Sequence, residues 1–162
     1  MEQESKANLE SLARRAVACA EWRWMEGMLA VPAPGSEYEG WCRILRASED
    51  GVNSWTDEDG DILDNEKDGD FATFADLIPW LDDPATLGCL LALVREKWGP
   101  DAHLVRLETH VVENCQMVPA TWWALAVGKS EPMWIVTPER RYCLAGATEA
   151  EALVAALEVQ NG

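Results

Sequence analysis

The chain has 162 residues, of which 48% are hydrophobic, and its 29 Asp and Glu against 13 Lys and Arg give a formal net charge of −16 at pH 7. This length predicts a single domain over residues 1–162, and the hydrophobic fraction argues against a globally disordered chain. The negative charge argues against direct binding to nucleic acid or to an anionic membrane, because both are polyanions. It favours a basic partner or a cation.

The first predicted element is a long helix over residues 8–29. Its apolar residues recur at spacings of three and four and form one stripe, which comprises Leu9, Leu12, Ala13, Ala16, Val17, Ala20, Trp24 and Met28. Pro32 and Pro34 follow this stripe, and we expect them to end the helix.

A hairpin and an acidic segment come next. Strands are predicted over residues 41–46 and 52–56, with a turn at Glu49-Asp50-Gly51 between them. From residue 49 to residue 83 there are thirteen Asp and Glu residues against one Lys, which places −12 of the net charge of −16 in about a fifth of the chain. The acidity is therefore a local feature of the sequence.

A second helix is predicted to begin after Asp83, a natural N-cap, with Pro84 at the first helical position. Gly99-Pro100 ends it, and its buried stripe comprises Leu87, Leu90, Leu91, Val94 and Trp98. The following part of the chain is rich in β-branched and aromatic residues, which predicts antiparallel strands over residues 103–112, 121–127, 133–137 and 141–144.

The last predicted element is a C-terminal helix. A capping box opens it, because Glu151 follows Thr148 by three positions, and its buried face comprises Leu153, Ala156 and Leu157. Strands joined by short turns favour an antiparallel sheet with helices packed against it. We therefore predict an α+β fold of two layers, with a hairpin, a meander of three to four strands and about three helices.

Neither a secretory signal nor a membrane span is predicted. The N-terminus is acidic, and no apolar run approaches the roughly 18–20 residues that a membrane-spanning helix needs. The five cysteines are widely separated and form no C-x-x-C pair, which fits neither a disulfide framework nor a zinc ribbon. We expect a cytoplasmic protein with reduced thiols.

Calcium binding is one interpretation of the acidic segment, because its carboxylates recur at alternating positions. The best EF-hand register begins at Asp64 and places Asp68 fifth and Gly69 sixth. Its twelfth position is Ala75, where a bidentate carboxylate is required. We therefore predict no dedicated metal site and no cofactor, and expect weak, non-specific binding of divalent cations.

A partner-binding surface is the second interpretation. On an extended strand, Asp57, Asp59 and Asp61 would share one face at a spacing of roughly 6.6 Å, which is comparable with the spacing of phosphates along a nucleic-acid strand. So many like charges also destabilise a compact chain unless a partner or counterion relieves them. The alternative to a partner-binding surface is an ordinary solvated loop with no binding role. The predicted partner-binding residues are Asp57, Glu58, Asp59, Asp61, Asp64, Glu66, Asp68 and Asp70, with Trp55 as an apolar anchor.

No catalytic residue is predicted. Two Cys–His pairs have the residue types of a nucleophilic pair, Cys115 with His110 and Cys89 with His103, but the sequence shows no nucleophile loop or helix N-terminus that would lower the thiol pKa. His103 and His110 are seven positions apart on one predicted strand and so point to opposite faces. Trp122 and Trp123 are adjacent and must also point to opposite faces, so one of them can be exposed at an interface.

Two stretches of the chain carry a resemblance to a known family. They are D-D-P-A-T-L-G-C-L-L-A-L-V-R-E over residues 82–96 and T-E-A-E-A-L-V-A-A-L over residues 148–157. Both resemble small, uncharacterised proteins encoded by bacteriophages and prophages. The shared residues are helix cores and caps, so the resemblance implies a common fold and a phage origin, with the host bacterial cytoplasm as the location, and it carries over no catalytic residue.

These observations predict a non-catalytic, phage-derived interaction protein that binds a basic host protein. The most specific candidate partner is a nucleic-acid-binding component of host defence, so that the protein would be an anti-CRISPR or other anti-defence inhibitor and a nucleic-acid mimic. Direct contacts with nucleic acid or membrane are not expected. Two alternatives stay open, namely a carboxylate-rich module or enzyme that binds divalent metals, and a structural phage component.

Overall fold

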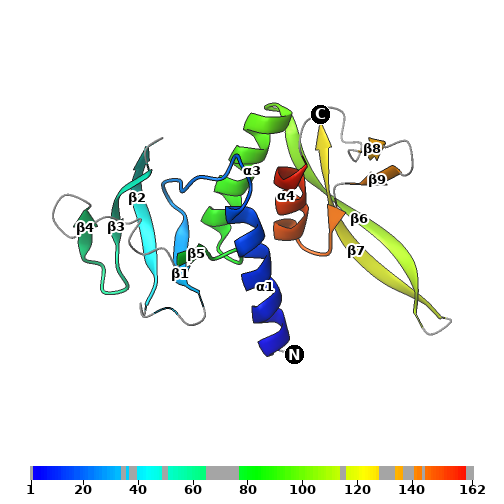
Figure 1. Ribbon diagram of the computed structural model, residues 1–162. Coiled ribbons are helices and arrows are strands. Elements are labelled where there is room, and N and C mark those ends of the chain that lie inside the picture. The colour runs from blue at the N-terminus through cyan, green and yellow to red at the C-terminus, as the bar shows by residue number, and fades with distance from the viewer. Residues whose placement is uncertain are drawn as a thin grey trace. The chain divides into compact units, whose positions relative to one another are not determined.

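A computed structural model describes residues 2–33, 36, 40–48, 51–64, 77–113, 116–127, 134–136, 141–143 and 145–159. Within them, three helices accompany antiparallel sheets of five and three strands and a two-stranded hairpin, which confirms the predicted α+β class (Figure 1). The chain divides into two compact units, Met1–Cys89 and Leu90–Gly162. Two such units are compatible with one domain, so the single domain stays a prediction.

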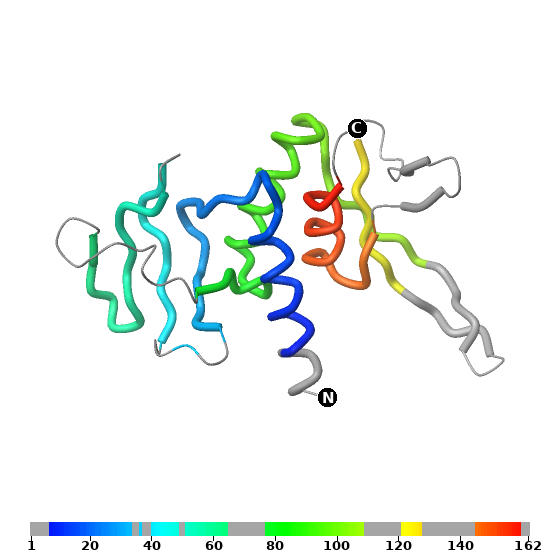
Figure 2. The backbone as a smooth tube through the Cα atoms, in the orientation of Figure 1, coloured from blue at the N-terminus to red at the C-terminus, as the bar shows by residue number. Residues whose placement is uncertain are grey.

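The first unit is built on a five-stranded antiparallel sheet in the order β4-β3-β2-β1-β5, which can be followed along the backbone in Figure 2. Helix α1 precedes the sheet and contacts β5. The predicted hairpin is confirmed as β2 and β3. The elements are α1 (Glu2–Val17), β1 (Leu29–Pro32), β2 (Cys42–Ser48), β3 (Gly51–Thr56), β4 (Ile62–Asp64), β5 (Leu77–Pro79) and the start of α3 (Pro84–Trp98), which continues into the second unit.

The first helix ends twelve residues earlier than predicted, at Val17 instead of Leu29. Beyond the helix, Trp22 and Met28 donate their backbone N–H groups to the carbonyls three residues earlier, which are turn hydrogen bonds, and β1 then begins at Leu29 and pairs with β2 and β5. Gly27, at φ 91°, adopts a left-handed conformation and donates its N–H to the Ile44 carbonyl at 2.8 Å. The prediction of one helix over residues 8–29 is therefore wrong beyond Val17, because turn hydrogen bonds replace helical ones before β1 and strand pairing replaces them at Leu29.

A cross-strand row of apolar side chains lies at the centre of the first unit. Ile44 on β2 pairs with Trp55 on β3, and Trp55 pairs with Leu63 on β4, so the three share one face of the sheet. Ile44 and Trp55 are buried. Further buried apolar residues of this unit are Leu12, Ala13, Ala16, Met28, Ala30, Ala33, Cys42, Val52, Leu77, Ile78 and Leu81.

Two short strands lie where the sequence predicted only an acidic segment. β4 pairs with β3 and β5 pairs with β1, so they form the two edges of the sheet within the described residues. Each has three residues, which is too short for an alternating pattern to be recognised in the sequence. Their strand conformation depends on partners that are distant in the chain.

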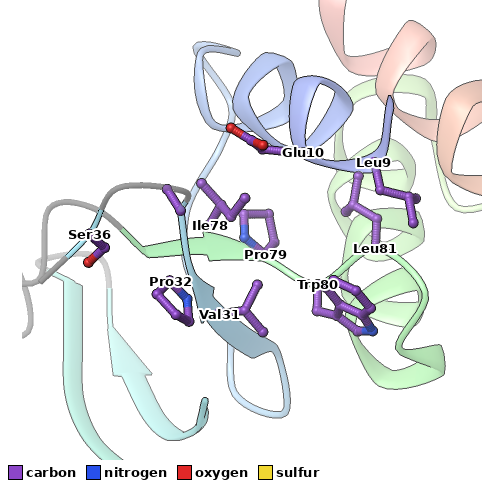
Figure 3. A pocket seen from close by; sticks show the side chains of 10 residues that line it. Leu9, Glu10, Val31, Pro32, Ser36, Ile78, Pro79, Trp80 and Leu81 are labelled. Carbon is purple, nitrogen blue, oxygen red and sulfur yellow. The ribbon is translucent and has the colours of Figure 1, made fainter. Parts of the chain in front are cut away.

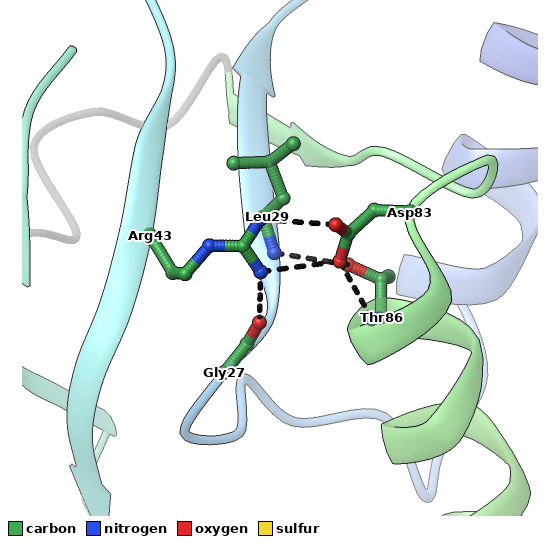
Figure 4. A network of polar contacts seen from close by, with 5 residues as sticks. All are labelled: Gly27, Leu29, Arg43, Asp83 and Thr86. Atoms are coloured by element: carbon green, nitrogen blue, oxygen red, sulfur yellow. Dashed lines mark hydrogen bonds and ion pairs between the residues drawn. The ribbon is translucent and has the colours of Figure 1, made fainter.

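A polar network joins the start of α3 to β1 and β2 (Figure 4). Asp83 caps the helix as predicted, since its Oδ2 accepts hydrogen bonds from the Thr86 N–H at 2.8 Å and from the Thr86 hydroxyl at 2.9 Å. Arg43 donates to both Asp83 oxygens, at 2.9 and 3.2 Å, and to the Gly27 carbonyl at 2.7 Å. The buried Thr86 hydroxyl accepts from the Leu29 N–H at 2.9 Å. The Asp83 carboxylate therefore links α3 to β2, and the Thr86 hydroxyl links α3 to β1.

The second unit contains a three-stranded sheet in the order β10-β7-β6. β6 (Ala102–Glu113) and β7 (Gln116–Val127) form a long hairpin, and β10 (Ala145–Gly146) pairs with the other edge of β7. β8 (Trp134–Val136) and β9 (Arg141–Cys143) pair only with each other among the described strands. The predicted meander is therefore wrong in one connection, because β10 and not the strand over residues 133–137 takes the third place beside β7.

Helix α4 (Glu149–Glu158) begins at the predicted cap. Thr148 Oγ1 accepts from the Glu151 N–H at 3.2 Å, and the Glu151 carboxylate accepts from the Ala147 N–H at 2.6 Å. Gly146 lies so close to this turn that a Cβ at its position would collide with the Glu151 side chain. A glycine is therefore required where β10 meets α4.

The last turn of α4 is held by the end of α3. Trp98 Nε1 donates to the Ala156 carbonyl at 3.0 Å, and Lys97 Nζ donates to the Leu157 carbonyl at 2.5 Å. These carbonyls belong to the turn that has no helical donors of its own. Leu153, Ala156 and Leu157 are buried, as predicted.

Candidate partner-binding surface

The described part of the predicted partner-binding surface lies at the turn between β3 and β4. We call residues 57–64 the acidic turn, and its carboxylates are those of Asp57, Glu58, Asp59, Asp61 and Asp64. The last three predicted residues, Glu66, Asp68 and Asp70, lie outside the described residues. Their role stays a prediction.

Asp57 organises the acidic turn. Its Oδ1 accepts from the N–H of Asp59 at 3.1 Å and of Asp61 at 2.9 Å, and its own N–H donates to the Asp61 carbonyl at 3.1 Å. Gly60 has a φ of 87°, which is a left-handed conformation. The predicted extended row with phosphate-like spacing is therefore wrong. A local Asx-type turn satisfies these backbone groups without the neighbouring strand that an extended segment would need.

The acidic turn exposes charged side chains and one large apolar side chain to solvent. Glu58, Asp59 and Asp61 are exposed, and Asp64 is half-buried. Ile62 is 71% exposed, whereas the other exposed large apolar side chains among the described residues are 36–41% exposed. The acidic turn therefore exposes a branched aliphatic side chain within a few residues of three exposed carboxylates.

The sequence prediction chose Trp55 as the apolar anchor and missed Ile62. Trp55 is 1% exposed, so its predicted role as a surface anchor is wrong. It shares the buried face of the sheet with Leu63, and Ile62, which is adjacent to Leu63, points to the opposite face. The Asp-Gly turn signal could have revealed this, because a turn over residues 57–61 returns the chain to β3 and places Ile62 beside Thr56.

The other tryptophans divide between surface and interior positions. Trp122 is exposed and Trp123 is half-buried on β7, which confirms that one of the adjacent pair reaches the surface. Trp80 is half-buried beside a cavity of the first unit. Trp41, immediately before β2, is exposed.

Of the two candidate Cys–His pairs, Cys115 lies outside the described residues, whereas Cys89 and His103 both lie near backbone carbonyls. Cys89 Sγ lies 3.4 Å from the Glu26 carbonyl, and burial, followed by the negative charge of Asp83, raises the pKa of this thiol. A raised thiol pKa opposes nucleophilic chemistry, because the thiolate is the reactive form. His103 Nδ1 lies 2.9 Å from the Asp101 carbonyl. Neither residue is therefore placed in a catalytic arrangement by the contacts described for it.

Two further observations concern metals and membranes. In the described ranges, no group of three or more His, Cys, Asp and Glu side chains is arranged to hold a metal ion. In the same ranges, no helix has the length and apolar character required to cross a bilayer.

Comparisons with protein-family models, curated proteins and solved structures find no match to this chain. The resemblance to phage-encoded proteins therefore stays a prediction. The acidic turn exposes four side chains to solvent, those of Glu58, Asp59, Asp61 and Ile62.

Proposed function

We propose that this protein is a non-catalytic interaction protein that binds a basic surface of another protein through the acidic turn. In the most specific form of the proposal, the chain derives from a phage and acts in the bacterial cytoplasm. Its partner there is a nucleic-acid-binding component of host defence, which it inhibits by occupying a site that otherwise holds nucleic acid.

The proposal depends on one observation, which is that Ile62 is exposed in a turn whose Glu58, Asp59 and Asp61 are exposed too. An exposed acidic loop alone is ordinary, because charged side chains prefer water. A 71% exposed isoleucine has an unfavourable contact with water that a partner would remove. The surrounding Glu58, Asp59 and Asp61 would steer a basic partner toward it and disfavour acidic ones.

The turn geometry also supports a defined surface. Asp57 uses its carboxylate to hold the backbone, and Glu58, Asp59 and Asp61 are exposed on the loop that it shapes. A preorganised loop loses less conformational entropy on binding than a disordered acidic tail does. Clustered charge on such a loop supports mimicry of a polyanion by charge density, without the regular phosphate spacing of an extended row.

The test compares three baits in affinity capture from a bacterial lysate, followed by binding measurements with the purified partner. The first is the wild-type chain, and the second carries Glu58→Gln, Asp59→Asn and Asp61→Asn. The third is a matched control with the same change in charge at exposed acids outside the turn, Glu26→Gln, Asp82→Asn and Glu108→Gln. We expect the wild type and the control to retain the same partner and the turn variant to lose it.

Salt, a hydrophobic substitution and competition then test the mode of binding. The Kd for the purified partner is expected to rise at least about tenfold between about 50 and 300 mM NaCl. Ile62→Ser is expected to weaken binding by about tenfold at constant charge. Duplex DNA is expected to compete. Capture of the same proteins by all three baits, or a Kd independent of salt, would overturn the proposal.

A further inference from the structure

A cavity of about 420 Å³ lies in the first unit, between α1 and the β1–β5 edge of the sheet (Figure 3). Its size falls in the range of roughly 300–1,000 Å³ that is typical of small-molecule sites. Leu9 and Glu10 come from α1, Val31 from β1, Ile78 from β5, and Trp80 directly follows β5. All of these elements belong to one compact unit.

The cavity exists because the side chains on its strand side are small or held in place. Pro32, Ala33 and Ser36 line it with short side chains that leave space beneath α1. Val31 and Ile78 are a cross-strand pair, and the Trp80 N–H donates to the Leu29 carbonyl at 2.9 Å. Backbone hydrogen bonds between paired strands therefore hold Val31, Ile78 and Trp80 in place along the cavity.

We propose that this cavity binds a small apolar molecule that carries a cationic amine, with the apolar body against Val31, Ile78 and Trp80 and the amine at the Glu10 carboxylate. Among the described residues that line the cavity, Glu10 is the one that carries a charge. The formal net charge of −16 also favours a cation over an anion on approach. The aromatic face of Trp80 adds a surface to which cationic and apolar groups both bind well.

A ligand amine can bind the Glu10 carboxylate without the loss of a strong ion pair. Its partner is Arg14, whose Nε lies 3.1 Å from Glu10 Oε1 in an i,i+4 pair, and the Arg14 side chain is 54% exposed. Exposed helix pairs of this kind contribute little to stability, because water screens the two charges. An amine held in the cavity can therefore share or replace the arginine. This predicts that Arg14 competes with the ligand.

The test uses the full chain and three probes of similar shape and different charge: phenethylamine, phenethyl alcohol and hydrocinnamate. Calorimetry measures affinity, and amide chemical shifts in ¹⁵N NMR locate the site. We expect saturable binding of the amine with shifts in β1, β5 and α1, weaker binding of the alcohol and the weakest binding of the carboxylate. Binding of the alcohol at least as tight as that of the amine, or no saturable binding of the amine, would overturn the proposal.

Substitutions then separate the charge from the cavity. Glu10→Gln is expected to weaken amine binding about fivefold and to leave alcohol binding unchanged. Glu108→Gln is the matched control, because Glu108 is also ion-paired, with Arg106 at 3.7 Å, and lies in the second unit. Arg14→Gln is expected to tighten amine binding. Equal effects of Glu10→Gln and Glu108→Gln would contradict the role of Glu10.

Filling the cavity is the last arm of the test. Val31→Phe is expected to abolish binding of the amine and the alcohol alike, and Leu9→Phe provides the same test from α1 if the strand variant does not fold. Both side chains line the cavity and are only half-buried, so a larger residue can be accommodated at each. Unchanged amine affinity in a folded filling variant would place the ligand elsewhere and overturn the proposal.

Discussion

The guanidinium of Arg43 on β2 forms a two-point ion pair with the carboxylate of Asp83 at the start of α3, with Nη2–Oδ1 and Nη1–Oδ2 distances of 2.9 and 3.2 Å. The same carboxylate caps the helix through Thr86. One side chain thus caps the first turn of α3 and ties that turn to β2 within the first unit.

Removal of this carboxylate should destabilise the protein. Asp83→Ala is expected to lower the free energy of unfolding by roughly 2–3 kcal/mol, because it removes a helix cap and leaves Arg43 without its charged acceptor. Asp82→Ala is the control, since Asp82 is adjacent and exposed. Urea denaturation followed by circular dichroism measures both. Equal losses for the two variants would contradict the role assigned to Asp83.

The ion pair should also make stability depend on pH. Burial by itself would raise the pKa of the Asp83 carboxyl, but hydrogen bonds from Arg43 and Thr86, together with the Arg43 charge, hold it below its ordinary value of 3.8. The contribution is therefore present above about pH 4 and is lost as the pH falls through the lower folded-state pKa. The difference in unfolding free energy between wild type and Asp83→Asn should shrink between about pH 6 and about pH 3. A constant difference would contradict this linkage.

The free energy of unfolding should depend more on the hydroxyl group of Thr86 than on the volume of its side chain. The hydroxyl accepts from the Leu29 N–H and donates to Asp83, and the residue is fully buried. Thr86→Val leaves that backbone donor without its partner and is expected to cost about 1–3 kcal/mol. Thr86→Ser keeps the hydroxyl and should cost less in the same denaturation experiment. A serine variant less stable than the valine variant would show that packing dominates.

Trp55 should behave as a core residue and not as a binding residue. Trp55→Ala is expected to reduce the free energy of unfolding by about 3–5 kcal/mol, because a large buried ring leaves a cavity. Trp41→Ala, at an exposed tryptophan of the same unit, should change it by no more than about 1 kcal/mol. Thermal and urea unfolding measure the pair. Similar stability of both variants would contradict the placement of Trp55.

The cysteines should differ in reactivity. Burial raises the pKa of the Cys42 thiol to about 12, so it stays protonated and inaccessible in the folded protein. Alkylation by iodoacetamide at about pH 8, read by peptide mass spectrometry, should modify Cys19 before Cys89, with Cys42 modified only on unfolding. Modification of Cys42 at the rate of Cys19 in the folded protein would contradict this order.

Features with a local cause were predictable from the sequence. The Asp83-Pro84 start of α3, the Thr148 cap of α4 and the β2–β3 hairpin depend on residues within a few positions of one another. The location of the acidic segment is also a property of the sequence. Successive side chains of a strand point to opposite faces, so the adjacent Trp122 and Trp123 could be assigned to different faces without a structure.

The candidate surface was predictable in position and not in geometry. The acidic residues were found, but the expected row became a turn once Asp57 bonded to the backbone of Asp59 and Asp61. The apolar anchor was assigned to the wrong residue because the strand register of β4 depends on its pairing with β3. A shift of one residue exchanges the two faces of a strand, so side-chain exposure cannot be known before the register is.

The sequence by itself determined the helix caps, the apolar periodicities and the concentration of charge, since these follow from spacing along the chain. Only the tertiary structure decided that α1 ends at Val17, that β1 lies between β2 and β5, and that β10 takes the place beside β7. The physical reason is that a strand's hydrogen bonds are completed by distant segments. The same pairing buries Trp55 and leaves Ile62 in solvent beside the acids.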